Sequence, residues 1–167
     1  MSFITRFSWN KLYVCLLIIS SLLFSNIIYA DNITKSDNYN NDLYEFVYFN
    51  NNYKKYETYP WELKKVNEFI MPYNKLASKY NFDKWATDMS GPGRRNRLIK
   101  IKSVEYILVR TCKQKECDTN NLLILFEPVN KEFCGLFINN SNKMHVGSIC
   151  NDIIIATLEN IAINDNK

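Results

Sequence analysis

The chain has 167 residues, 47% of them hydrophobic and 14% aromatic, which allows one well-buried domain and is too short for two. Four glycines and four prolines exclude a collagen-like or linker-like chain. The 21 basic and 17 acidic residues give a formal net charge of +4, which by itself does not indicate a nucleic-acid-binding protein.

Residues 1–30 have the pattern of a secretory signal peptide. Arg6 and Lys11 precede an apolar run over residues 12–24, and Ala30 provides a small residue before the expected cleavage point. The run is shorter than a membrane-spanning helix requires, although an uncleaved N-terminal anchor is the alternative. We expect export, cleavage after Ala30 and no stable membrane insertion of the mature protein. Loss of Arg6 and Lys11 leaves 19 basic and 17 acidic residues, a mature net charge of +2.

Export also changes the interpretation of the cysteines. Cys15 leaves with the signal peptide, and the even number that remains in an exported domain indicates disulfides, with three pairings open. The short spacing of Cys112 and Cys117 favours a bond between them, and Cys134 with Cys150 then follows by elimination. A zinc site is the alternative, but zinc ribbons usually have two residues between paired ligands, and here there are four and fifteen.

The mature chain divides into a segment and a domain. Residues 31–56 are polar and aromatic, and the stretch 43–49 within them suits either a strand or a short helix. Residues 57–167 carry the apolar patterns of one folded domain, without internal repeats.

The first element of this domain is predicted to be a helix. Thr58 can act as its N-cap, and Glu62 adds a favourable charge in the first turn. Apolar residues then recur at spacings of three and four, which places them on one face: Leu63, Val66, Phe69 and Ile70. Pro72 ends or kinks the helix.

After this helix the apolar residues recur at every second position, which predicts strands. They cover residues 98–109 as one or two strands, 122–126, 133–138, 144–149 and 153–158. A helix followed by a run of strands indicates an α+β fold: an antiparallel sheet of about five strands with a helix packed on one face.

Little in the sequence indicates catalysis. The one histidine, His145, lies beside a predicted turn, where an exposed hairpin position is the plain interpretation. The carboxylates are scattered among strand ends. We therefore expect no enzyme activity, no metal and no cofactor.

One basic run stands out from the rest of the chain. Its members are Arg94, Arg95, Arg97, Lys100 and Lys102. Because an exported protein meets little nucleic acid, we expect no nucleic-acid partner and interpret the run as an edge strand whose charges prevent aggregation. Binding to an acidic partner or a glycan is the alternative.

The most informative segment is the hexapeptide Cys112-Lys113-Gln114-Lys115-Glu116-Cys117, called the stapled loop below. A disulfide would close a small ring, project its polar tip beyond the sheet and stabilise the fold by about 2 kcal/mol. It would also fix the shape of a loop that otherwise loses entropy on binding. Small stapled loops with polar tips are typical of protein inhibitors that enter an enzyme cleft.

The stapled loop resembles the signature loop of the inhibitor of vertebrate lysozyme (Ivy) family, which reads Cys-Lys-Pro-His-Asp-Cys. Cys112, Lys113 and Cys117 match, and Glu116 keeps the acid. Outside the loop the resemblance includes a tryptophan, a glycine pair, a tyrosine and an apolar triplet: Trp85, Gly91 and Gly93, Tyr106, and Gly135-Leu136-Phe137. The similarity spans about residues 61–158.

The resemblance implies a periplasmic, Ivy-like α+β domain over residues 57–167, and a homodimer is one state that it allows. It further implies an exported inhibitor of c-type lysozyme whose stapled loop enters the active-site cleft. There the family's histidine contacts the catalytic carboxylates, and Lys115 takes its place here. Lys113 would add a second positive charge near the mouth of the cleft.

Three features of this chain depart from the family. Gln114 stands where the family has proline, so the loop lacks a fixed φ angle. Cys134 and Cys150 are additional to the family motif. The mature domain is slightly basic, as animal c-type lysozymes are, so charge would not steer the two together. The alternative is therefore an Ivy-like binding or immunity protein whose partner is another peptidoglycan hydrolase or a wall component.

Overall fold

The structure is a computed structural model that describes residues 43–164. The predicted signal peptide and residues 31–42 lie outside the described residues. The described chain contains six strands: β1 (Glu45–Val47), β2 (Arg97–Ile101), β3 (Val104–Cys112), β4 (Asn121–Glu127), β5 (Glu132–Asn139) and β6 (Asn142–Gly147). Its helices are α2 (Asn67–Lys79), α3 (Lys84–Thr87) and α4 (Asp152–Asn164), with two short 3-10 helices, η1 (Lys54–Tyr56) and η2 (Pro60–Lys65).

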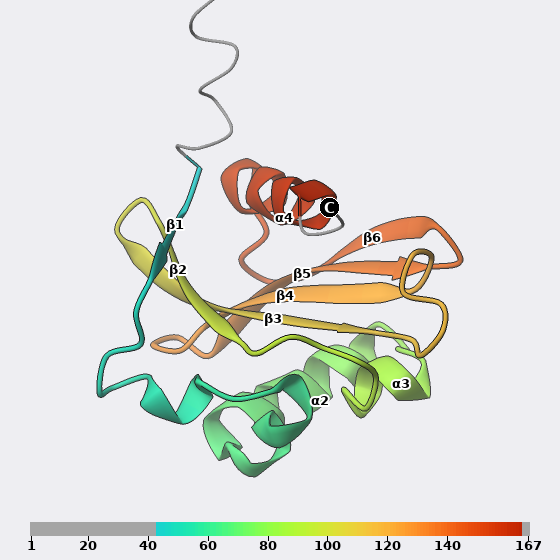
Figure 1. The fold of residues 1–167 in the computed structure, drawn as a ribbon, viewed down its shortest axis with the longest axis horizontal. Helices are drawn as coiled ribbons and strands as arrows, with labels where there is room; N and C mark the ends of the chain where they lie inside the picture. Colours follow the sequence, from blue (N-terminus) through green and yellow to red (C-terminus); the bar gives the residue numbers. More distant parts are fainter. Residues whose placement is uncertain (1–42, 165–167) are drawn as a thin grey trace, which may run out of the picture. The chain divides into compact units, whose positions relative to one another are not determined.

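The strands form one antiparallel sheet in chain order, β1-β2-β3-β4-β5-β6 (Figure 1). In the central pairs Leu108 lies opposite Leu125, and Leu123 lies opposite Leu136. The structure therefore confirms the predicted α+β fold with an antiparallel sheet, with six strands where the sequence predicts about five. The helices η1, η2, α2 and α3 all lie in the long connection between β1 and β2.

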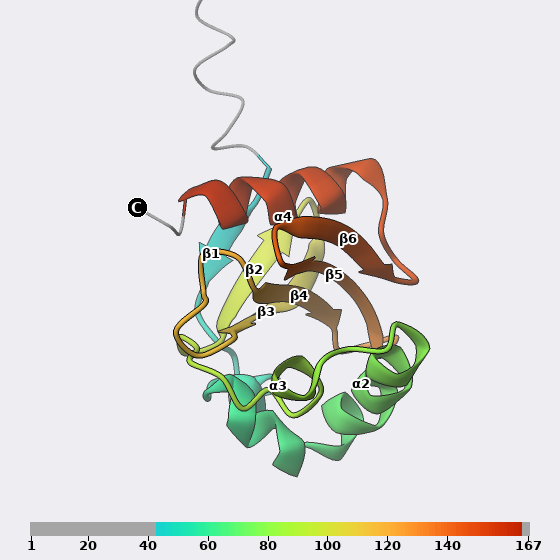
Figure 2. The same cartoon turned by 90° about the vertical axis from the view of Figure 1, so that its right-hand side faces the viewer.

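Helices cover both faces of the sheet, whereas the sequence predicts a helix on one face only (Figures 1 and 2). On one face, Phe69 of α2 packs edge-on against Phe126 of β4 and Phe133 of β5, with ring centroids 5.1 and 5.4 Å apart. On the other face, three residues of α4 pack against β4 and β5: Ile154, Leu158 and Ile161. Burial on both faces explains why β4 is a continuous buried run without alternation.

The prediction of a strand over residues 153–158 is wrong, because this stretch belongs to α4. The run of β-branched residues is typical of a strand, but Asn151 begins a helix. Its Oδ1 accepts hydrogen bonds from the N–H groups of Ile153 and Ile154, both at 3.1 Å. The buried positions of α4 then recur at helical spacing. Within residues 43–164 no helix has the length and apolar character needed to cross a membrane.

The predicted first helix is divided into two. A 3-10 helix, η2, precedes α2, and Val66 in an extended conformation separates them. Thr58 does not cap either helix, since η2 begins after Tyr59 and no side chain caps it. Pro72 lies inside α2, which continues to Lys79. The predicted apolar face is nevertheless the buried one, as Leu63 and Phe69 are fully covered.

The basic run does not form an edge strand, which corrects that prediction. Arg97 and Lys100 lie in β2, and β2 pairs with β1 on one side and β3 on the other. The Nζ of Lys100 lies 3.4 Å from Oε1 of Glu45 in β1. β1 and β6 are the edges of the sheet.

Tyr73 is a buried polar residue in the layer between α2 and the sheet. Its side chain is fully covered, and its hydroxyl donates a hydrogen bond of 2.6 Å to the carbonyl oxygen of Ala86. Burial, with a smaller contribution from the charge of Asp88, raises the pKa of Tyr73 above its ordinary value. The folded state therefore holds this proton at a pH where the unfolded chain releases it.

This difference predicts alkaline destabilisation. The contribution of Tyr73 to stability is complete below the unfolded pKa of about 10 and is lost as pH rises further. Tyr73→Phe should lower the free energy of unfolding near neutral pH by about 0.5–1.5 kcal/mol, because the buried hydrogen bond from the tyrosine hydroxyl is lost while the Ala86 carbonyl keeps the Met89 N–H as a donor. The variant should also lose less stability than the parent between about pH 9 and 11. Urea unfolding followed by tryptophan fluorescence measures both effects, and equal alkaline losses would contradict the role of Tyr73.

Candidate functional site

The stapled loop connects β3 to β4 at one end of the sheet (Figure 1). Cys112 is the last residue of β3, and the structure joins it to Cys117 with Cα atoms 5.0 Å apart. This is the pair that the sequence predicts. The side chains of Gln114 and Lys115 at the tip are exposed, so the loop projects from the domain instead of folding back onto it.

The tip of the loop is a tight turn. The N–H of Glu116 donates to the carbonyl oxygen of Lys113 at 3.0 Å, and Lys115 has a left-handed backbone with φ of 69°. A hydrogen bond over four residues with a positive φ only at the third is the pattern of a type II turn. Such a turn favours glycine or asparagine at that position, so a lysine costs about 1–2 kcal/mol. The surrounding contacts have to hold it there.

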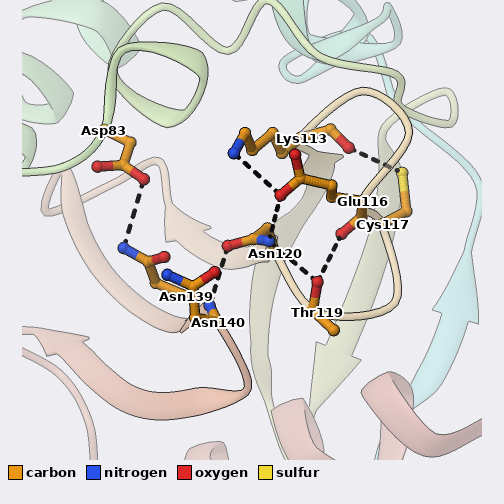
Figure 3. A network of polar contacts seen from close by, with 8 residues as sticks. All are labelled: Asp83, Lys113, Glu116, Cys117, Thr119, Asn120, Asn139 and Asn140. Carbon is orange, nitrogen blue, oxygen red and sulfur yellow. Dashed lines mark hydrogen bonds and ion pairs between the residues drawn. The ribbon is translucent and has the colours of Figure 1, made fainter.

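Glu116 provides most of those contacts (Figure 3). Its Oε2 accepts hydrogen bonds from Nζ of Lys113 at 2.9 Å and from Nδ2 of Asn120 at 3.0 Å. The ammonium of Lys113 is therefore neutralised inside the loop. The resemblance implies a second positive charge from Lys113, and the structure instead makes that lysine a part of the loop framework.

Asn120 joins the stapled loop to the turn between β5 and β6. It is 1% exposed, and its Oδ1 accepts a hydrogen bond from the N–H of Asn140 at 2.9 Å (Figure 3). Beside it, the N–H of Ser141 donates to the carbonyl oxygen of Thr119 at 3.0 Å. Asn139 of the same turn donates to Asp83, just before α3, at 3.3 Å. The turn between β5 and β6 thus supports the base of the loop, and Asp83 in turn holds that turn.

Backbone hydrogen bonds close the loop at its base. The N–H of Lys113 donates to the carbonyl oxygen of Asn120 at 3.0 Å, and the N–H of Asn120 donates to that of Glu116 at 2.8 Å. Nδ2 of Asn121 donates to the carbonyl oxygen of Cys117 at 3.3 Å. With the disulfide, these bonds fix the loop from Cys112 to Asn121 before any partner binds.

Gly91 and Gly93, the glycine pair noted in the sequence, have a steric role beside the Cys112–Cys117 disulfide. A Cβ on Gly91 would overlap the carbonyl oxygen of Cys112, and a Cβ on Gly93 would lie 2.6 Å from the carbonyl oxygen of Arg110. Between them, Pro92 accepts a hydrogen bond from the N–H of Cys112 at 3.0 Å. Only glycines let this segment lie so close to the end of β3.

Lys115 is the free cation of the loop. Among residues 43–164 no carboxylate pairs with it, in contrast to Lys113. The described part of the chain has no cluster of three or more His, Cys, Asp or Glu side chains that could hold a metal ion. What this tip offers chemically is an exposed ammonium that donates hydrogen bonds to acceptors on another molecule.

The second disulfide lies away from the loop and has a structural position. It joins Cys134 of β5, which is fully buried, to Cys150 just before α4, with Cα atoms 5.0 Å apart. This is also the pair that the sequence predicts. The bond ties the start of α4 to the sheet face that the helix covers.

His145 does not lie near the stapled loop's tip. It belongs to the edge strand β6, is partly buried, and places its Nε2 3.4 Å from Oε1 of Glu159 in α4. The structure thus puts it on the face that α4 covers.

Sequence reasoning missed Asn120 and Asn121 as parts of the site. They follow Asp118 and Thr119 in a stretch that looks like an ordinary polar turn. The usable signal was the residue type, because asparagine side chains bond to nearby backbone groups in turns. The long-range partner, Asn140, has no local signal at all.

Removal of the Asn120 amide should loosen the loop. Asn120→Ala leaves the Asn140 N–H without its acceptor and the Glu116 carboxylate with Lys113 alone, and should lower the free energy of unfolding by about 1–3 kcal/mol. Hydrogen exchange of the amides of residues 113–119 should become faster. The matched control is Asn74→Ala, since Asn74 is exposed on α2. Unchanged exchange in the loop would show that the disulfide alone orders it.

Comparison with known proteins gives one distant similarity. Over 56 residues the chain is 30% identical to the inhibitor of vertebrate lysozyme of Pseudomonas aeruginosa. The matched part is 34% of this chain and 37% of that protein, so the chain spans about a third of the length of the relative it matches. No family model matches the chain. The similarity confirms, at the level of a distant match, the resemblance that the sequence motifs indicate.

Proposed function

We propose that the protein is an exported inhibitor of c-type lysozyme that inserts the stapled loop into the active-site cleft. The observation that carries this proposal is the tip of the loop: a preformed, exposed turn with an unpaired ammonium at Lys115. The distant similarity to an inhibitor of vertebrate lysozyme supports the class of target. The signal-peptide pattern of residues 1–30 supports export to the periplasm.

The chemistry of Lys115 suits an acidic cleft. An ammonium donates three hydrogen bonds and keeps its charge throughout the physiological pH range. Facing two carboxylates in a partly dry cleft, it would form charge-assisted hydrogen bonds, which are about twice as strong as neutral ones. The histidine that the family carries at this position is largely neutral near pH 7.

The rigidity of the loop matters as much as its charge. Each rotamer-rich side chain that becomes ordered on binding costs about 0.5–1.5 kcal/mol. The hydrogen bonds that Glu116 accepts from Lys113 and Asn120 order these side chains before the encounter. Gln114 and Lys115 are then the two exposed tip side chains that remain to be ordered.

Another peptidoglycan hydrolase is the alternative target. The observation that favours it is charge: the loop segment 112–118 carries two lysines and two acids, and the mature chain has a net charge of only +2. A basic c-type lysozyme would gain no long-range attraction from this surface. A hydrolase with a less basic surface would lack that disadvantage.

Lys115→Ala tests the proposed role directly. Alanine keeps the steric cost of the left-handed position and removes the amine with the three methylene groups that carry it, so the loop should keep its shape. We expect at least a tenfold weaker inhibition of hen lysozyme in a cell-wall clearing assay. The control is Lys131→Ala, because Lys131 is also an exposed lysine with a left-handed backbone, at φ of 59°, in the turn between β4 and β5.

The assay separates the two targets. No slowing of hen or human lysozyme by a large molar excess of the parent protein would remove c-type lysozyme as the target. Inhibition that Lys115→Ala retains in full would disprove the role of the amine while leaving the target in place.

Gln114→Pro should improve both stability and inhibition. Gln114 is the second residue of the turn, where proline fits the required φ, and its exposed N–H has no hydrogen-bond acceptor among the described residues. By restricting the unfolded chain, the change should raise the free energy of unfolding by about 0.4–1 kcal/mol. Inhibition should tighten to a similar degree. A decrease in thermal stability would show that the turn is not of this type.

A further inference from the structure

An open cleft lies between β1 and the segment that leads into β2. It has a volume of about 440 Å³, within the usual range of about 300–1,000 Å³ for small-molecule sites. Its lining includes three aromatic residues: Phe46, Tyr48 and Phe49. It also includes two arginines, Arg95 and Arg97. None of the residues of the stapled loop takes part in this cleft.

The two arginines are held in place by the residue between them. Asn96 is 3% exposed; its N–H donates to the carbonyl oxygen of Thr58 at 2.7 Å, and its Nδ2 donates to that of Tyr56 at 3.1 Å. Because alternate residues of an extended chain point to opposite sides, burial of Asn96 directs both neighbours outward. The guanidinium groups are therefore presented by a fixed backbone.

An aromatic ring lies against each guanidinium group, in direct contact for Arg97 and near the limit of a cation–π interaction for Arg95. The Cζ atom of Arg97 lies 3.3 Å from the ring centre of Phe46, and that of Arg95 lies 5.8 Å from the ring centre of Tyr59. Neither arginine forms an ion pair with a carboxylate among residues 43–164. Stacking on a ring fixes the plane of a guanidinium and leaves the N–H groups at its edge free to donate.

The cleft also offers an acceptor and a flat exposed ring. Glu57 lies at the edge and pairs with Lys54. The hydrogen bond from Lys54 lowers the pKa of the Glu57 carboxyl, and the charges of Lys54 and Arg95 act in the same direction, so it stays ionised. The ring of Tyr48 is 99% exposed. A carboxylate acceptor suits a hydroxyl, and an aromatic face suits the C–H face of a sugar ring.

We propose that this cleft binds an acidic saccharide, with the sugar ring stacked near Tyr48 and its carboxylate held by Arg95 and Arg97. A simple anion would use the arginines but not the aromatic face. An apolar ligand would use the rings and leave two guanidinium groups unpaired. A sugar acid uses the rings, the arginines and the hydroxyl acceptor Glu57 together.

N-acetylmuramic acid of the bacterial cell wall is one source of this chemistry, and uronic-acid polysaccharide is another. The choice of the wall sugar rests on the proposed export to the periplasm. The site itself is independent of lysozyme inhibition, since the stapled loop lies outside the cleft. Binding at both sites would hold the inhibitor on the wall that it protects.

The test is an NMR or calorimetric titration of the purified protein with three disaccharides. The first is N-acetylglucosaminyl-N-acetylmuramic acid, the second is the neutral N,N′-diacetylchitobiose, and the third contains glucuronic acid. We expect the neutral sugar to bind at least fivefold more weakly than the better of the two acidic ones. Preference for the muramic disaccharide identifies the cell wall as the source of the ligand, and preference for the glucuronic disaccharide identifies a uronic-acid polysaccharide. Equal binding of neutral and acidic sugars, or no binding of either acidic sugar, overturns the proposal.

Variants locate the site. Arg95→Gln with Arg97→Gln should weaken binding at least tenfold, whereas Lys102→Gln, which removes a cation from the turn between β2 and β3, should change it less than twofold. Tyr48→Ala, which cannot disturb the core because its ring is exposed, should weaken binding severalfold. Acetate that competes as well as the sugar acids, or Tyr48→Ala that binds normally, overturns the assignment.

The lysozyme assay distinguishes inhibition by the stapled loop from saccharide binding in the cleft. The double arginine variant should inhibit lysozyme as the parent does, and Lys115→Ala should bind the acidic disaccharide as the parent does. Loss of saccharide binding in Lys115→Ala would show that the ligand occupies the loop instead of the cleft, and would overturn this inference alone.

Discussion

The carboxylate of Glu116 is the interaction on which the stapled loop depends. It receives one hydrogen bond from Lys113 within the loop and one from Asn120 at the base, so it links the tip to the body of the domain. This arrangement holds a lysine in a backbone conformation that lysine rarely adopts. It also leaves a single unpaired positive charge at the tip. A loop with two free lysines would be more strongly charged but less ordered.

The way the sheet is covered limits where a recognition loop can lie. Because helices cover both faces, the surfaces left for recognition are the ends and edges of the sheet. The stapled loop occupies an end, between β3 and β4, and the arginine-lined cleft occupies the edge at β1. The long connection between β1 and β2 contributes to both places: Gly91 and Gly93 lie beside the disulfide, and Arg95 and Arg97 line the cleft.

Local patterns were sufficient to predict the α+β class, most strands and both cysteine pairs. They failed where two local signals compete or where the partner is distant. The β-branched run at 153–158 resembles a strand, and only the Asn151 cap and the spacing of the buried residues mark it as a helix. The basic run resembles an edge strand until β1 is known to pair beside it. The hydrogen bond from the N–H of Asn140 to Oδ1 of Asn120 spans 20 residues, and no periodicity in the sequence reveals it.

The bond between Cys134 and Cys150 gives the molecule a dependence on its chemical surroundings. It closes a segment of fifteen intervening residues, for which chain entropy gives about 3 kcal/mol. Small domains have a total stability of only about 5–15 kcal/mol. In a reducing compartment the chain would lack this contribution to its stability and the covalent link between α4 and the sheet. With the export proposed above, the chain would gain this stability only in the compartment where disulfides form.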